Sequence, residues 1–241
     1  MKDVFTLVNL VAGVVAVNYA LTGRPRDAGY AVLVGFLLGD IVDGTVARAT
    51  GTANRFGAEF DAVTDHFVHV FVPALVFFEV YDRAGHRALG VVAAGALIAG
   101  ATLRHARFAA AKFDYPQCWC GVPRSISGFA ALSFALSTFL GGEAGYVVGF
   151  SVVVVLSALN IVPIPYMTHR GRRAMQWYVK ATVIPWFIAL AVMLLFARHY
   201  LFDLFLAGAL FFVAFGWFPV HPEERRAFYA EYRRWAAELA G

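Results

Sequence analysis

Four aspartates, arranged as two pairs, are the residues of this chain best suited to chemistry. Asp40 and Asp43 are three residues apart, and Asp61 and Asp65 are four residues apart. On a helix, each pair shares one face. Both pairs adjoin long apolar segments, where carboxylates are costly and mark a functional site. Two helices that bring the pairs together need one or two hard divalent cations to relieve the repulsion, so the pattern predicts a metal site.

Small residues and one arginine accompany the carboxylates. Gly44 and Ala47 belong to the first acidic segment, and Gly57 precedes the second pair by one turn. Small residues let helices or a ligand approach the backbone, although helix packing alone explains any single glycine. Arg48, five residues after Asp43, is placed to hold phosphate oxygens. Carboxylates, small residues and a guanidinium together predict a phosphoryl or pyrophosphate site.

The composition is that of an integral membrane protein. The chain has 241 residues, of which 60% are hydrophobic and 15% charged, and its mean hydropathy is +0.66. A soluble domain of this length cannot bury so much apolar surface. A net charge of +4 does not indicate nucleic acid as a partner. We expect an all-α fold in a single domain, 1–241, with eight apolar segments of about 20 residues that could span a membrane: 4–22, 28–49, 57–81, 88–112, 126–141, 144–163, 180–199 and 201–219.

The C-terminal segment 221–240 is polar but carries an apolar stripe at helical spacing, formed by Phe228, Tyr232, Trp235 and Leu239. Such a helix is suited to lie on the membrane surface, with a solvated tail helix as the alternative.

Basic residues predict the orientation. Of the 20 Lys and Arg residues, five fall in the segments that would be outside if the N-terminus is inside, namely Arg24, Arg26, Arg83, Arg87 and Arg198. The other fifteen fall on the inner side, which predicts that both termini and the aspartates face the cytoplasm of a multi-pass protein of the cell membrane.

The spacing Asp40-x2-Asp43-Gly44-x2-Ala47-Arg48-x8-Gly57-x3-Asp61-x3-Asp65 resembles, without a gap, the signature of the CDP-alcohol phosphotransferase family. The resemblance implies an enzyme that transfers a lipid-phosphate group from a CDP-linked lipid, CDP-diacylglycerol or CDP-archaeol, to an alcohol and releases CMP. It also implies a homodimer, and a six-helix catalytic core to which this chain adds two C-terminal helices.

The same resemblance implies roles for the residues of the signature. All four aspartates would hold Mg2+ or Mn2+, as two ions, and Asp65 would also be the base for the acceptor hydroxyl. The CDP-lipid would lie against five residues of the signature: Asp43, Gly44, Ala47, Arg48 and Gly57.

Features outside the signature are similar to those of membrane-embedded phosphatidylserine and archaetidylserine synthases. These are the opening run 5–13, Pro73-Ala74, the run 103–108 and the run 121–123. L-serine is therefore the expected acceptor. The acceptor-binding residues would be His69, Arg104, Arg107 and Arg124, and for these arginines membrane anchoring is the alternative.

One departure keeps other acceptors open. Serine enzymes typically carry Ser-Phe-Gly where this chain has Val68-His69-Val70. His69 either lines the acceptor pocket or orients an aspartate. Inositol phosphate, glycerol phosphate or an amino alcohol remains an alternative acceptor. A cation or proton transporter is a more distant alternative, because it leaves the fixed glycine, alanine and arginine positions unexplained.

Overall fold

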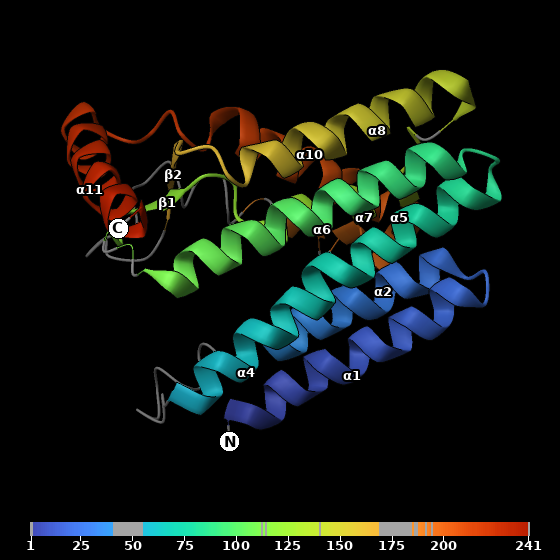
Figure 1. Ribbon diagram of the computed structural model, residues 1–241. Helices are drawn as coiled ribbons and strands as arrows, with labels where there is room; N and C mark the ends of the chain where they lie inside the picture. Colours follow the sequence, from blue (N-terminus) through green and yellow to red (C-terminus); the bar gives the residue numbers. More distant parts are fainter. Residues whose placement is uncertain are drawn as a thin grey trace.

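The computed structural model describes residues 2–40, 55–111, 113, 115–139, 141–168, 185, 188–190, 192–193 and 195–240. The expectations for Asp43, Gly44, Ala47 and Arg48 lie outside these residues, and for Asp40 only the backbone is described. The described part is almost entirely helical, as expected, and its long helices apart from the C-terminal one run along roughly one common direction (Figure 1).

The helices follow the apolar segments of the sequence. The first is α1 (Lys2–Leu21), followed by α2 (Pro25–Gly35) and the π-helical η1 (Phe36–Asp40). One long helix then comprises α4 (Arg55–His66), the π-helical η2 (Phe67–Phe71) and α5 (Val72–Arg83). The other helices of the described residues follow α5 in the chain, namely α6 (Arg87–Ala110), α7 (Arg124–Leu136), α8 (Gly142–Leu159), η3 (Arg198–Tyr200), α10 (Leu201–Phe215) and α11 (Pro222–Ala240).

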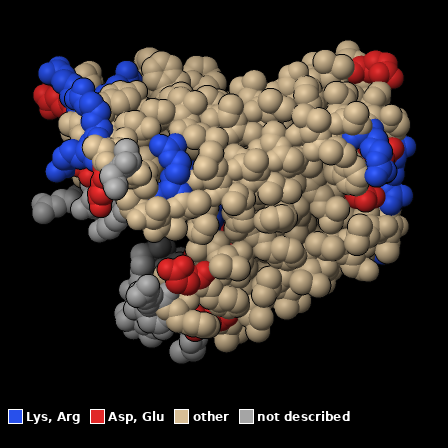
Figure 2. Space-filling view, in the orientation of Figure 1, with Lys and Arg blue, Asp and Glu red and all other residues tan. Residues whose placement is uncertain are grey.

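Within the described residues, five helices are long and apolar enough to cross a membrane. They are Asp3–Leu21, Phe56–Arg83, Arg87–Ala110, Gly142–Leu159 and Arg198–Phe215. Figure 2 shows Lys, Arg, Asp and Glu gathered at the two ends of these helices, with a broad uncharged band between them. This distribution fits a multi-pass membrane protein. The expected segment 180–199 is described only in part, so the predicted total of eight spans stays a prediction.

The turns at one end are built from residues that suit them. Gly23 and Gly85 take positive φ angles of 80° and 87°, which glycine adopts without steric cost. Pro25 then begins α2, where its missing N–H is not needed. The start of α1, the start of α4 and the end of α6 lie at the opposite end, together with α11 (Figure 1). Asp40, Asp61 and Asp65 thus belong to the end that carries both termini, whereas Asp43 lies outside the described residues.

Helix α7 is the centre of the bundle. Every residue from Ser127 to Leu136 is buried, so the helix packs on all sides. One core cluster joins it to α1, α2, α5 and α10, and another joins it to α5, α6 and α8. The expected span 126–141 is thus a short internal helix of 13 residues rather than a lipid-facing span.

Pro73 explains the π-helical segment η2. Proline has no N–H, so the carbonyl of His69 loses its usual partner four residues later. In the turn before Pro73, the N–H of Val72 bonds the carbonyl of Phe67, five residues back, as in a π-helix. Gly128 of α7 packs directly on the His69 carbonyl, because a Cβ at residue 128 would lie 1.7 Å from that oxygen. The π-helical hydrogen-bonding pattern of η2 and Gly128 of α7 therefore meet at the same point, the His69 carbonyl.

Two short strands, absent from the all-α expectation, lie beyond the ends of the helices. β1 (Cys118–Cys120) pairs antiparallel with β2 (Pro165–Met167), and Trp119 faces Tyr166. Both cysteines are free and buried, and burial raises the pKa of the Cys120 thiol to about 11. The strand pair ties the α6–α7 connection to the segment after α8.

The C-terminal helix α11 packs on the protein itself. Phe228 and Trp235 are buried against the segment between α6 and β1, and Tyr232 is partly buried there. The Trp235 indole stacks on Phe108 at 5.1 Å and donates a hydrogen bond of 2.8 Å to the Ala111 carbonyl. The apolar stripe expected to face lipid therefore faces protein. Location of this helix at the membrane surface stays a prediction that now depends on its opposite, charged face.

Replacing Trp235 with alanine is expected to release α11. The change removes the stack and the indole hydrogen bond, and a buried tryptophan truncation costs about 3–5 kcal/mol. Limited proteolysis of the purified protein should then cut near residues 216–222 at least tenfold faster. Tyr229→Ala is the matched control, because the Tyr229 side chain on the same helix is exposed. Equal cleavage rates for both variants would contradict this packing.

Candidate functional site

The second aspartate pair lies on one face of α4. Gly57, Asp61 and Asp65 are spaced by four residues, as the sequence predicts. Gly57 is buried, while Asp61 and Asp65 are half-buried. The two carboxylates are thus one turn apart, near the end of a membrane-spanning helix, and remain partly open to solvent or a ligand.

His69 continues this face one turn further, inside η2. Its Nδ1 lies 3.4 Å from Oδ1 of Asp65, and its side chain is 1% exposed. The ring is enclosed by Phe36 of η1 and Phe129 of α7, at centroid distances of 5.6 and 5.2 Å. Of the two roles left open by the sequence, this burial favours orienting Asp65 over touching an acceptor.

The first aspartate segment approaches along α1. At Gly39, beside Asp40, a Cβ would lie 2.6 Å from the Asn9 side chain and 2.9 Å from the Phe5 carbonyl. Glycine therefore lets η1 lie directly on α1. Helix α4 packs on α1 as well. Helix η1, which ends at Asp40, and helix α4, which carries Asp61 and Asp65, therefore share α1 as a neighbour.

Arg124, the first residue of α7, joins α4 to α6. Its Nη2 donates to the Ala62 carbonyl at 3.0 Å, one residue after Asp61, and its Nη1 donates to His105 Nδ1 at 2.9 Å. His66 Nε2 lies 3.0 Å from the Thr102 hydroxyl, and the two imidazoles are 5.8 Å apart. Of the three predicted acceptor arginines, Arg124 is thus the one whose described contacts reach the aspartate helix.

Arg104 and Arg107 hold the end of α6 to other parts of the chain. Arg104 donates to the carbonyls of Cys120 and Asn160, the latter at 3.0 Å. Arg107 donates to the Ile161 carbonyl at 3.4 Å and to the Tyr232 hydroxyl at 3.3 Å. The Arg107 guanidinium also lies 5.0 Å from the Trp235 ring. These contacts give both arginines a structural role that neither anchoring nor acceptor binding anticipates.

The carboxylates suit a hard divalent ion by their chemistry. Magnesium and manganese take carboxylate oxygens, and Asp61 and Asp65 present such groups on adjacent turns. Among the described residues no group of three or more acidic, histidine or cysteine side chains forms a complete cluster. The predicted ligands Asp40 and Asp43 belong to the part whose side chains are not described, so the four-carboxylate site stays a prediction.

Sequence reasoning left several polar residues of this region without a role. His105 lies beside Arg124, His66 lies beside His105 and Thr102, and Asn9 is buried beside the glycine that precedes Asp40. Their sequence signal is weak, because single polar residues in apolar helices are common. Their position in the chain is a usable signal, because His66 directly follows Asp65 and His105 directly follows Arg104.

The comparison with known families decides the reaction class. A model of the CDP-alcohol phosphatidyltransferase family matches residues 2–158, from α1 to the end of α8. The chain belongs to this family. The reaction class of this CDP-alcohol phosphatidyltransferase is therefore shown, while α10 and α11 lie outside the matched region.

Curated relatives of this phosphatidyltransferase are serine enzymes by name. The CDP-diacylglycerol–serine O-phosphatidyltransferase of Helicobacter pylori is 25% identical over 190 residues, which cover 76% of each chain. The enzyme of the same name from Mycobacterium bovis is 32% identical over 78 residues, or 32% of this chain and 27% of the relative. The Mycobacterium tuberculosis enzyme gives the same values.

Proposed function

We propose that this CDP-alcohol phosphatidyltransferase transfers the lipid-phosphate group of CDP-diacylglycerol or CDP-archaeol to the hydroxyl of L-serine. The observation that carries the proposal is the line of Asp61, Asp65 and His69 on one face, at the end of a membrane-spanning helix. The names of the relatives support serine as the acceptor.

Asp65 is the proposed base. The acceptor oxygen attacks the lipid-bearing phosphorus, the bond from that phosphorus to the oxygen of CMP breaks, and Asp65 takes the hydroxyl proton. His69 holds the Asp65 carboxylate from its buried side. Two Mg2+ or Mn2+ ions, bound by Asp40, Asp43, Asp61 and Asp65, would neutralise charge on the diphosphate. Gly44, Ala47, Arg48 and Gly57 would border the CDP group, together with Asp43.

Arg124 is the proposed contact for the acceptor. Its hydrogen bonds to His105 and to the Ala62 carbonyl fix the guanidinium between α4 and α6, next to the Asp61–Asp65 turn. Arg104 and Arg107 support this pocket by fixing the end of α6. We further propose a homodimer in the cell membrane with this end toward the cytoplasm, as the excess of basic residues there favours.

CMP release from an acceptor panel tests the proposal. Purified protein with CDP-diacylglycerol and Mg2+ should release CMP with L-serine, and chelation of the metal should abolish the release. Manganese should restore it. If glycerol 3-phosphate or inositol phosphate supports CMP release and L-serine does not, serine is rejected as the acceptor while the reaction class is retained. Chelator-resistant release would reject the metal assignment.

A further inference from the structure

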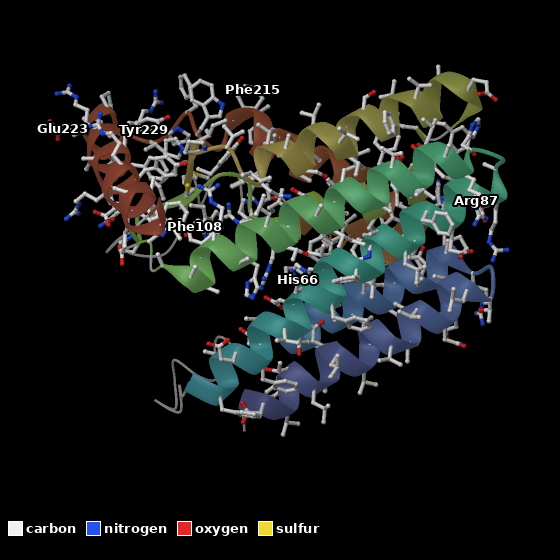
Figure 3. All side chains as sticks on the ribbon, in the orientation of Figure 1. His66, Arg87, Phe108, Phe215, Glu223 and Tyr229 are labelled. Carbon is white, nitrogen blue, oxygen red and sulfur yellow. The ribbon has the colours of Figure 1, made fainter. Side chains whose placement is uncertain are left out.

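The turn that joins α10 to α11 exposes large aromatic side chains. It comprises residues 216–220, in which Trp217 is 40% and Phe218 is 71% exposed. Phe211 and Phe215 of α10 precede the turn, and each is more than half exposed. Figure 3 shows Phe215 at the outer edge of the bundle, at the end of the molecule that carries α11. We call residues 216–220 the aromatic turn.

The aromatic turn continues the surface of a membrane-spanning helix. In the described part of the chain, Arg198–Phe215 is one of the helices long and apolar enough to cross a membrane. Phe211 and Phe215 are one turn apart on it, with ring centroids 5.0 Å apart, so they share one side. The rings of Trp217 and Phe218 follow in the chain and lie 6.1 Å apart. The exposed apolar side of a spanning helix faces lipid, and here it runs on into the turn without a polar residue.

Arg225, near the start of α11, supplies hydrogen-bond donors to the backbone of the aromatic turn. Its Nε donates to the Val220 carbonyl at 2.9 Å. Its Nη2 donates to the carbonyls of Trp217 and Phe218 at 3.3 and 3.2 Å. The guanidinium carbon also lies 5.4 Å from the centroid of a Trp217 ring. One cation from inside the protein therefore binds three carbonyls of the turn and one of its aromatic faces.

The carbonyls at the end of α10 are also bonded within the protein. The Tyr166 hydroxyl donates to the Val213 carbonyl at 3.2 Å, and the Met167 N–H of β2 donates to the Gly216 carbonyl at 2.8 Å. The Trp217 indole donates to a carbonyl of its own helix, that of Ala214, at 2.8 Å. Backbone N–H groups of the same segment donate to the two remaining carbonyls, those of Phe212 and Phe215.

This combination of backbone and side chains suits lipid rather than water. A helix end in water commonly leaves its last carbonyls to solvent. Here the carbonyls of residues 212–218 and of Val220 all accept from protein donors, while the aromatic side chains are exposed. Hydrocarbon tolerates backbone only when its polar groups are satisfied internally. Tryptophan is also enriched where the hydrocarbon meets the headgroups.

We infer that the aromatic turn is inserted into the bilayer and anchors the start of α11 there. Its partner is membrane lipid, which it contacts by apolar ring area rather than by headgroup charge. Helix α11 is then held at its start by lipid and along its buried stripe by Phe108 and Ala111. The inference is independent of the proposed reaction, because the turn lies outside the family match over residues 2–158.

Spin labels at two exposed positions test the insertion. Phe218→Cys and Ala230→Cys are each labelled with a nitroxide and reconstituted into phosphatidylcholine nanodiscs. Ala230 is the matched control, because it is exposed on α11 opposite the buried Phe228. The wild type, whose two cysteines are buried, gives the background labelling.

Oxygen and a water-soluble nickel chelate then report the surroundings of each label. Oxygen partitions into hydrocarbon and the chelate does not, so the ratio of relaxation by oxygen to relaxation by nickel should be about tenfold higher at 218 than at 230. Equal ratios at both positions, with strong relaxation by nickel, would place the turn in water and overturn the inference. Protection of position 218 from both reagents would mean that a second copy of the chain or another protein covers the turn, which would also overturn it.

A charge in the aromatic turn tests the anchoring of α11. Phe218→Asp places a carboxylate in lipid, so the turn should leave the bilayer and proteolysis within 216–222 in nanodiscs should be at least about tenfold faster. Phe218→Trp keeps a large aromatic ring and should be cut at the wild-type rate, as should Ala230→Asp on the exposed face of α11. Equal cleavage of Phe218→Asp and Ala230→Asp would contradict the anchoring.

Discussion

Asp65→Asn is expected to reduce CMP release by about a thousandfold, with the protein still folded. The amide cannot take the acceptor proton, and general bases contribute about 10²–10⁴-fold to such reactions. It is also a poorer ligand for a hard cation than a carboxylate. The Nδ1 of His69 can contact the amide oxygen in place of the carboxylate oxygen that lies 3.4 Å away, so the packing of η2 against α7 should be preserved. The measurement is CMP release at saturating CDP-diacylglycerol and acceptor.

The control uses the same substitution on the same long helix. Asp82 lies near the other end of α5 and pairs with Arg87 at 3.2 Å. Asp82→Asn should keep more than half of the wild-type rate, since ion pairs at exposed positions contribute little to stability. Full activity in Asp65→Asn would remove this residue from the chemistry, and loss of activity in both variants would show a general effect on the fold.

Gly128→Ala is expected to lower the thermal midpoint by about 5 °C or more and to abolish most activity. The added Cβ would lie 1.7 Å from the His69 carbonyl oxygen and 2.9 Å from the carbonyl carbon. Both atoms are backbone and cannot rotate away, so α7 must move off η2. Overpacking of this kind costs about 1–3 kcal/mol or more. Activity should fall because His69, Phe129 and Arg124 are placed by this contact.

Gly95→Ala provides the comparison. Gly95 is also inside a helix, α6, but nothing lies within 4 Å of the Cβ that would be added. Alanine at this position should leave the midpoint unchanged or raise it slightly, because helical glycine costs about 1 kcal/mol relative to alanine. Thermal unfolding in one detergent for both variants measures the difference. A stable, active Gly128→Ala protein would mean that α7 and η2 are not in contact.

The sequence was sufficient for the membrane class and the reaction class. Composition and apolar length predicted helices at the observed places, and the spacing of Gly57, Asp61 and Asp65 on one helix face is confirmed. The family match over residues 2–158 confirms the resemblance drawn from the aspartate signature, and it removes the reason to consider a transporter. Charge in an apolar segment is rare enough to stand out without a structure.

Other features of the fold could not be predicted from the sequence, because apolar periodicity does not tell whether lipid or protein covers an apolar face. The stripe of Phe228 and Trp235 suits lipid and protein equally, and only its packing on Phe108 and Ala111 distinguishes them. The burial of α7 on every side is likewise invisible in a sequence where lipid-facing helices are apolar too. Arg104 and Arg107 resemble membrane anchors or ligand contacts, whereas their partners include backbone carbonyls more than fifty residues away and, for Arg107, the Tyr232 hydroxyl.

The π-helical turn at η2 sets the two halves of one long helix out of phase. Such a turn holds one residue more than an α-helical turn, and each residue of an α-helix advances the direction of its side chain by about 100°. The extra residue therefore changes the direction in which the side chains of residues 72–83 point relative to those of Asp61 and Asp65. A related chain with one residue fewer between positions 67 and 71 would keep its aspartate spacing, yet it would turn a different side of α5 toward α6 and α7. A single-residue gap at this place in an alignment would thus indicate that α5 is rotated about its axis while α4, which carries the aspartates, is unchanged.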